Sequence, residues 1–275
     1  MLSDSTKVPF TPSALNAKET YMMALPLPWI NLLAYAANTL ITYGVGVGWF
    51  GDFSDNATIS RKYQSIVTPA GWAFSIWGVI FTAQLFWVLA QLQPKFKNSC
   101  PTVEAVGLNY VWVCVVQAGW TFSFAFELIP ISFIFMVSIL AFLWIIFKKL
   151  QPLSEHYLWK FPFYIHFGWI VAATSVNASV VLVWLKASAK VQFMAGLASL
   201  VILLLISLRV TALDYTIPGV LVWALLGIYS ELNHADDNIK ATFASGQVES
   251  ICTGALTGAT IVVAAILAKS GASHK

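Results

Sequence analysis

The stretch TPAGWAFSIW, residues 68–77, opens the second of eight apolar segments in this chain of 275 residues. Proline is tolerated in the first turn of a helix, where its missing N–H would have no helical partner, so Pro69 marks a helix start. Trp72 and Trp77 are five residues apart, which is about 140° around a helix at about 100° per residue. The two indoles therefore face different neighbours, an arrangement that a helix spanning lipid alone does not need.

The composition indicates a membrane protein. The chain is 59% hydrophobic and 10% charged, and so much apolar surface cannot be buried in one water-soluble core. Runs of about 20 apolar residues are long enough to cross a hydrocarbon layer of about 30 Å. The net charge of +3 is small, and the basic residues are scattered between the apolar segments. No nucleic-acid partner is therefore expected.

We predict eight spans, all helical, because a backbone amide in lipid must find its partner within its own segment. The seventh is short and opens with Pro218 and Gly219, so it either crosses the membrane or forms a re-entrant or strongly buried piece. The expected fold class is all-α, a polytopic membrane helical bundle. The eight ranges are 27–50, 70–92, 105–126, 130–147, 161–185, 191–208, 217–229 and 248–268.

The lysines and arginines between the spans predict the orientation. With eight crossings, most of the 15 Lys and Arg residues fall on the side that holds both chain ends. Cytoplasmic loops carry the excess of basic residues, so both termini are expected to face the cytoplasm of an integral, multi-pass protein. The residues before the first span, 1–26, form a polar tail without the pattern of a cleaved signal peptide.

Two helix faces combine aromatic and polar side chains at spacings of three and four, which places each set on one side of its helix. Such faces are unsuited to lipid and are expected to look into the bundle. The face on the third span consists of Asn109, Trp112, Val116, Trp120, Ser123 and Glu127. The face on the fifth span consists of His166, Trp169, Ala173, Asn177, Val180 and Trp184, flanked by Thr174 and Ser175.

The tryptophans of the second span and the polar residues of these two faces also have a purely structural interpretation. Trp72 could anchor the helix at the interface, and Trp77 could pack against lipid or another helix. Asn177 is either a packing contact between helices or part of a lined cavity. His166 either ligates the metal of a tetrapyrrole or is a hydrogen-bonded histidine near the membrane boundary. Two facing stripes of Trp and Asn, with Ala where the wall is thin, predict a flat slot for a planar hydrophobic ligand.

The sequence motifs on the second, third and fifth spans resemble those of the TspO/translocator-protein family, the tryptophan-rich sensory proteins. The resemblance covers residues 27–186 and predicts a five-helix core. The chain departs from the family in several ways: Ala70 stands where a second Pro is usual, and residues 64–67 lack a Trp. The Pro-to-Trp spacing on the fifth span is longer, and residues 180–186 lack the Tyr of the family's proposed cholesterol motif. The matching residues are Pro69, Gly71, Trp72 and Trp77 on the second span, Leu108, Asn109 and Trp112 on the third, and Pro162, Trp169, Ala173, Thr174 and Asn177 on the fifth.

The resemblance implies a protein that binds a tetrapyrrole such as protoporphyrin, or a sterol or other lipid, with a role in sensing or transport. It implies no required cofactor and no metal ion, and no nucleophile with a base points to an enzyme. A carrier for a small amphipathic molecule and a structural subunit of a membrane complex are the alternatives. The implied ligand-binding residues are Trp72, Trp77, Asn109, Trp112, Trp169, Ala173, Thr174 and Asn177, with His166 as the candidate axial ligand.

Residues 187–275 form an extension of about three membrane helices, similar to that of the longer members of the family. The run from Gly254 to Gly258 has the small-xxx-small spacing that permits close helix packing. We interpret this extension as an assembly interface, through which the glycine-containing helix faces could form a homo-oligomer. The three cysteines, Cys100, Cys114 and Cys252, form no CxxC pair and are expected to be packing residues.

Overall fold

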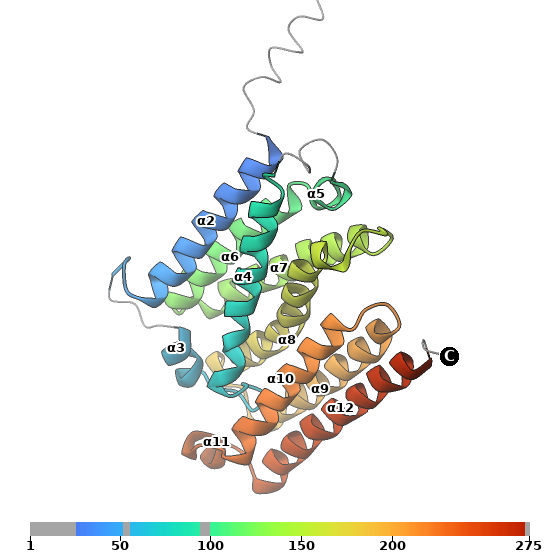
Figure 1. The fold of residues 1–275 in the computed structure, drawn as a ribbon. Helices are drawn as coiled ribbons and strands as arrows, with labels where there is room; N and C mark the ends of the chain where they lie inside the picture. Colours follow the sequence, from blue (N-terminus) through green and yellow to red (C-terminus); the bar gives the residue numbers. More distant parts are fainter. Residues whose placement is uncertain (1–25, 52–55, 94–99, 273–275) are drawn as a thin grey trace, which may run out of the picture.

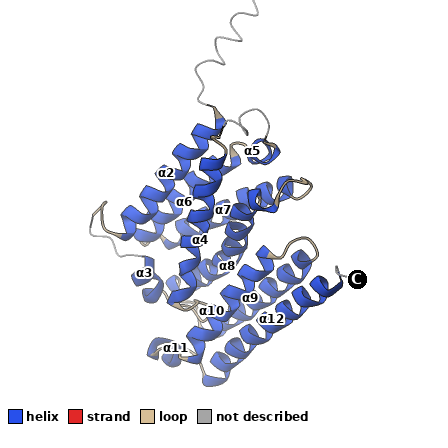
Figure 2. Ribbon diagram, viewed as in Figure 1, coloured by secondary structure: helices blue, strands red, loops and turns tan. Residues whose placement is uncertain are grey.

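The computed structural model describes residues 26–51, 56–93 and 100–272, and every regular element in these ranges is a helix (Figure 2). The all-α fold class is therefore confirmed, while the polar tail predicted before the first span lies almost wholly outside the described residues. The helices are α2 (Leu27–Gly46), α3 (Asn56–Lys62), η1 (Gly71–Ser75), α4 (Ile76–Ala90), α5 (Pro101–Val106), α6 (Asn109–Ala125), α7 (Ile129–Leu150), η3 (Tyr157–Trp159), α8 (Phe161–Trp184), α9 (Ala189–Thr211), α10 (Thr216–Asn233), α11 (Asp237–Thr242) and α12 (Ser245–Ala272).

Five helical segments among the described residues are long and apolar enough to cross a membrane. They make the chain an integral, multi-pass membrane protein. The other three predicted spans correspond to α2, α6 and α10, which are also helices but are shorter or carry more polar side chains. The five segments are Gly71–Ala90, Ile129–Leu150, Phe161–Trp184, Ala189–Thr211 and Ser245–Gly271.

Two predicted spans have different bounds in the structure. The third does not begin at residue 105, because Gly107 takes a positive φ of 51° and separates the short α5 from α6. Glycine adopts this conformation without steric cost. The seventh is longer than predicted, since α10 has 18 residues and starts where Asp214 Oδ1 accepts a hydrogen bond from the Ile217 backbone N–H at 2.8 Å. It is a full helix that packs against α8, α9 and α12.

The helix α8 joins two groups of helices. Figure 1 shows α2, α4 and α6 on one side of it and α9, α10 and α12 on the other. It contacts α4 of the first group and also α7, which packs against α6 of that group. In the second group it contacts α9 and α10. The close approach to α10 depends on Gly168, where an added Cβ would lie 3.0 Å from Val220 Cβ and 3.3 Å from the Ile217 backbone. The C-terminal helices are thus packed directly against the five-helix part.

The glycines of α12 are used for packing inside the chain. An added Cβ at Gly254 would lie 3.1 Å from Leu200 Cδ1 of α9, and one at Gly258 would lie 3.5 Å from Leu225 Cδ1 of α10. The close helix packing expected from the small-xxx-small spacing is thus seen at Gly254 against α9, while Gly258 makes an ordinary van der Waals contact with α10. The homo-oligomer through the same faces stays a prediction.

The segment between α3 and η1 is buried against the C-terminal helices. Residues 65–70 are all buried, and the Ala70 backbone N–H donates to the Gly227 carbonyl of α10 at 2.9 Å. An added Cβ at Gly227 would lie 2.9 Å from Pro69 Cβ, and one at Gly196 of α9 would lie 2.9 Å from Ile66 Cγ2. Residues 65–70 therefore lie packed against α9 and α10.

Candidate ligand-binding site

A cavity of about 480 Å³ lies inside the bundle, with walls from α3, η1, α4, α6, α7, α8, α9 and α10. Its lining along α8 extends from Trp169 to Val180, which is ~16 Å at 1.5 Å per residue. Volumes of about 300–1,000 Å³ are typical of small-molecule sites. The cavity is therefore large enough for a ligand of several fused rings.

Four of the predicted ligand-binding residues line this cavity: Trp77, Trp169, Ala173 and Asn177. The Trp169 ring meets the Trp77 ring edge-on, with centroids 6.4 Å apart, and the Phe74 ring in the same way at 5.7 Å. The predicted face of the fifth span is thus confirmed over residues 166–180, since these positions of α8 turn inward. Its last member, Trp184, is 40% exposed.

The other four predicted residues lie outside the lining. Trp72 donates through Nε1 to Ser230 Oγ at 3.2 Å and packs edge-on against Trp223 at 4.7 Å. Trp112 is 52% exposed and stacks on Phe142 of α7. Asn109 and Thr174 use their side chains to bond backbone carbonyls, at residues 106 and 170 respectively.

The prediction that Trp112 shares a cavity with Trp169 is wrong because the inward face of α6 is not the predicted one. The buried positions of this helix include Tyr110, Val113, Gln117 and Thr121, a stripe rotated from the predicted stripe by about one residue. The neighbours of α6 are α2 and α7, and they decide which side is covered. Near the end of α6, Trp120 still reaches the cavity, together with Phe124. Their rings stack with an interplanar angle of 15° and form a flat wall.

His166 is fully buried next to the cavity but does not line it. Tyr110 Oη donates to Gln84 Oε1 at 3.2 Å, and Gln84 Nε2 is 3.0 Å from His166 Nδ1. In this chain of hydrogen bonds Nδ1 accepts, so the proton of the neutral ring is on Nε2. A nitrogen that carries a proton offers no lone pair to a metal. The geometry therefore favours the hydrogen-bonded histidine over the axial ligand.

Several polar atoms of the lining residues have no hydrogen-bond partner within the described part of the chain. They are the acceptors Asn177 Oδ1 and Gln64 Oε1 and the indole donors Trp120 Nε1 and Trp169 Nε1. Buried polar groups in proteins are nearly always paired with protein or water, and leaving one unpaired costs about 1–3 kcal/mol. These atoms belong to residues that line the cavity but are themselves covered by neighbouring atoms, in walls that are otherwise largely apolar.

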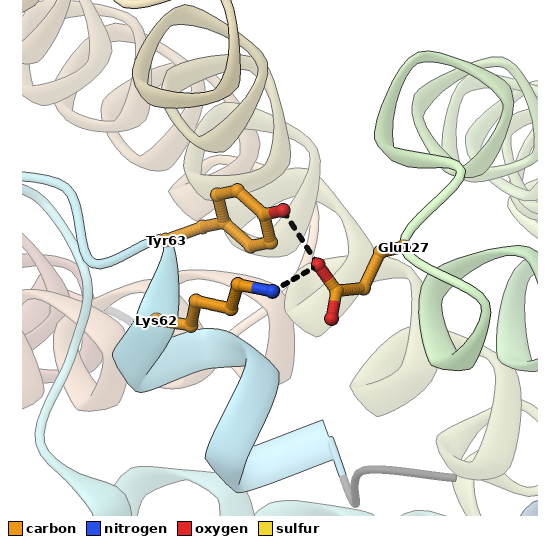
Figure 3. A network of polar contacts seen from close by, with 3 residues as sticks. All are labelled: Lys62, Tyr63 and Glu127. Atoms are coloured by element: carbon orange, nitrogen blue, oxygen red, sulfur yellow. Dashed lines mark hydrogen bonds and ion pairs between the residues drawn. The ribbon is translucent and has the colours of Figure 1, made fainter.

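The helix α3 closes one end of the cavity, to which it contributes Ser60, Arg61 and the following Gln64. On one side, Lys62 Nζ and Tyr63 Oη both reach Glu127 Oε2, at 2.5 and 2.6 Å (Figure 3). On the other side, Gln64 Nε2 donates to Glu231 Oε1 of α10 at 2.8 Å. The helix is therefore fastened both to the turn after α6 and to the end of α10.

The contact at Glu127 shifts the pKa values of its members. The hydrogen bonds from Lys62 and then from Tyr63 lower the pKa of the Glu127 carboxyl. The same bond raises the pKa of the Lys62 amine, and the hydrogen bond to the carboxylate raises the pKa of the Tyr63 hydroxyl. All three groups are therefore in the form that keeps α3 fastened at neutral pH.

The C-terminal helices α9 and α10 provide one wall of the cavity. The sequence patterns do not predict this wall. The contributing residues of α10 are Ala224, Ile228 and Glu231, and α9 adds Ser199 and Leu203. The spacing of four and three along α10 is a helical stripe that ends in a carboxylate, and this is a signal in the sequence. It indicates only that the residues share a face, and the cavity on that face is a property of the tertiary structure.

Fold and site together define an all-helical integral membrane protein with an aromatic-lined internal cavity, closed at one end by a polar segment. The chain belongs to the TSPO-like protein family, since the model described as "TSPO-like protein" matches residues 28–268. This confirms the resemblance seen in the motifs, and the match includes the C-terminal helices. No curated protein and no solved structure matches the chain.

Proposed function

We propose that this TSPO-like membrane protein binds a planar hydrophobic ligand, a tetrapyrrole or a sterol, in the cavity beside α8, and that it acts in sensing or transport. The observation that carries the proposal is the set of aromatic rings around an open volume of about 480 Å³. Trp120 and Phe124 form a flat wall, while Trp77 and Trp169 stand edge-on to each other. Aromatic walls favour flat ligands, since rings stack or meet edge to face.

The unpaired atoms support a ligand that is not purely apolar. Asn177 Oδ1 is an acceptor and the indole N–H groups of Trp120 and Trp169 are donors; all three are buried, lack a partner among the described residues and belong to residues of the lining. A ligand with polar atoms at matching positions removes the cost of leaving these groups unpaired, about 1–3 kcal/mol for each. A linear hydrocarbon of equal volume cannot do so. This difference predicts selectivity for flat ligands with polar substituents over alkyl chains.

The test is a fluorescence titration of the purified protein with protoporphyrin and with the fluorescent sterol dehydroergosterol. Several tryptophans lie in or beside the cavity, so a bound chromophore should quench their emission with a saturable isotherm. Octadecanol serves as the flexible control: it should not displace either ligand. A linear, unsaturable response to both flat ligands would reject the proposed function.

We also propose that both termini face the cytoplasm, in keeping with the excess of Lys and Arg on their side. The proposal rests on eight crossings. Accessibility of single cysteines placed near residue 10 and near residue 273 to a membrane-impermeant maleimide, in right-side-out cells, tests the two ends separately. Labelling of either end from outside the cell contradicts this orientation.

A further inference from the structure

The lining of the cavity includes three residues with acceptor oxygens from three different segments of the chain, Gln64, Asn177 and Glu231. Gln64 Oε1 and Asn177 Oδ1 have no hydrogen-bond partner, and Asn177 is only 4% exposed. The carboxylate of Glu231, which also lines the cavity, is hydrogen-bonded to the side chain of Gln64. Among the described residues, its side-chain contact is the single hydrogen bond that Oε1 receives from Gln64 Nε2. The other carboxylate oxygen can accept a further hydrogen bond.

From this arrangement we infer that Glu231 of α10 is a specificity-determining residue, which with Gln64 and Asn177 selects ligands whose polar end is a hydrogen-bond donor. The chemical class is a flat apolar body with a hydroxyl or amino group at one end. The inference rests on the proposed function and narrows it, because it disfavours ligands that end in a carboxylate. It also gives the C-terminal helices a role in recognition, since α10 supplies the charged group.

A competing effect comes from Arg61, the cationic residue of the lining. Its guanidinium is exposed, and its nearest polar contact is Thr58 Oγ1 at 3.4 Å. Attraction to an exposed charge is screened by water and salt. Glu231 and Gln64 are half-buried, and repulsion between carboxylates grows as the local dielectric falls. The carboxylate of Glu231 should therefore outweigh Arg61 for a ligand that enters the cavity.

The experiment compares three probes with the same pyrene body: 1-pyrenebutanol, 1-pyrenebutylamine and 1-pyrenebutyric acid. Binding to the purified full-length protein in detergent is followed at pH 7 by energy transfer from tryptophan to pyrene. The wild type should bind the alcohol and the amine at least tenfold more tightly than the acid. In Glu231→Gln, which keeps the shape and the contact with Gln64, this ratio should fall to about threefold or less.

Two further variants complete the test. Glu249→Gln removes the same charge from the exposed surface of α12, outside the cavity, and should bind all three probes like the wild type. Arg61→Gln should widen the preference for the alcohol and the amine. Because Arg61 is exposed, this variant is expected to fold even if the substitution at Glu231 prevents folding.

The outcomes separate the two proposals. Binding of all three pyrenes with equal affinity, or an unchanged ratio in Glu231→Gln, overturns the role of Glu231 and leaves the flat-ligand cavity standing. A wild type that prefers the acid, with the preference lost in Arg61→Gln, also overturns it and assigns selection to Arg61. Failure of every pyrene to bind the wild type contradicts the proposed function itself, and the role of Glu231 falls with it.

Discussion

The two halves of α8 differ in their surroundings although they belong to one continuous helix. Residues 162–172 are all buried, and their large rings interlock with neighbouring helices, as where Phe163 meets Trp87 at 4.8 Å and Tyr110 at 5.8 Å. Residues 173–176 are half-buried, and three of the four line the cavity. The first half has Phe, Tyr and Trp where the second has Ala, Thr and Ser. Side chains thus become smaller along the helix where the cavity opens, although Trp169 and Ala172 at the end of the buried half also line it.

One polar atom in each half illustrates a further difference. In the packed half, His166 Nδ1 is paired with Gln84, which is paired in turn with Tyr110. In the cavity half, Asn177 Oδ1 has no partner among the described residues. A paired buried group stabilises the fold, and an unpaired one at a cavity is available to a ligand. Substitutions in the first half that lie outside the lining should therefore alter stability, and those at lining residues of the second half should alter affinity.

The largest effect is expected at Gly168 in the packed half. Gly168→Leu places a side chain where even a Cβ would lie 3.3 Å from the α10 backbone, and such overpacking should lower the free energy of unfolding by about 3 kcal/mol. Gly78→Leu on α4 is the matched control, because a Cβ there meets nothing within 4 Å. Thermal unfolding in detergent measures both. Equal melting temperatures for the two variants would show that α8 and α10 are not tightly packed.

The next effect concerns the buried hydrogen bonds of the packed half. Gln84→Leu leaves the Tyr110 hydroxyl and His166 Nδ1 without this partner, so stability should fall by about 2 kcal/mol, within the range of 1–3 for an unsatisfied buried group. Affinity for a flat ligand should stay the same, since Gln84 does not line the cavity. Unfolding and fluorescence titration on the same sample test both statements. A loss of affinity at unchanged stability would place Gln84 in the site.

In the cavity half, Ala173→Phe should fill the space opposite Trp120. Ligand affinity should fall at least tenfold, about 1.4 kcal/mol, while the melting temperature stays close to that of the wild type because the ring enters an open volume. Ala178→Phe, on the same helix but outside the lining, is the control and should bind normally. Unchanged affinity in Ala173→Phe would mean that the ligand binds elsewhere.

The two asparagines on predicted faces should behave differently. Asn177→Leu should reduce affinity for a ligand with a polar edge by about 1 kcal/mol, at the lower end of the cost of an unpaired group. Asn109→Leu should instead reduce stability by about 0.5–1.5 kcal/mol, the usual net contribution of one hydrogen bond, since Asn109 Nδ2 bonds the Val106 carbonyl across the turn at 2.9 Å. Affinity and melting temperature are measured for both. Normal affinity with a lowered melting point in Asn177→Leu would assign Asn177 to packing.

The smallest effect is expected at the exposed contact that fastens α3. Glu127→Gln should speed hydrogen–deuterium exchange in residues 56–64 relative to the wild type. The pKa of Glu127 is lowered in the fold, so the difference is fully present above the usual pKa of the carboxyl, 4.5, and disappears as pH falls through the lowered value. In the alkaline range the difference in exchange rate disappears as pH rises through the raised pKa of Lys62. A difference that persists at pH 2–3 would argue against the charge of Glu127 as its cause.

Local patterns predicted the α8 half of the site better than the α6 half. On α8 the spacing of Trp169, Ala173 and Asn177 places them on one face, and that face lines the cavity. On α6 the same reasoning chose the face with Trp112, which lies outside, since an indole is compatible with packing, lipid or a ligand. The side of α6 that is covered depends on where α2 and α7 lie. A three-to-four spacing defines a face without saying what the face meets.

The sequence by itself determined the membrane class, the all-helical fold and the family, because apolar runs of spanning length leave the backbone few alternatives in lipid. It also determined that Trp77, Trp169, Ala173 and Asn177 could be members of a site. Only the tertiary structure decided that α10 brings Glu231 to the same cavity and that the segment after α3 closes it. The hydrogen bonds from Gln64 to Glu231 and from Ala70 to Gly227 join residues more than 150 positions apart, and their formation depends on how whole helices pack.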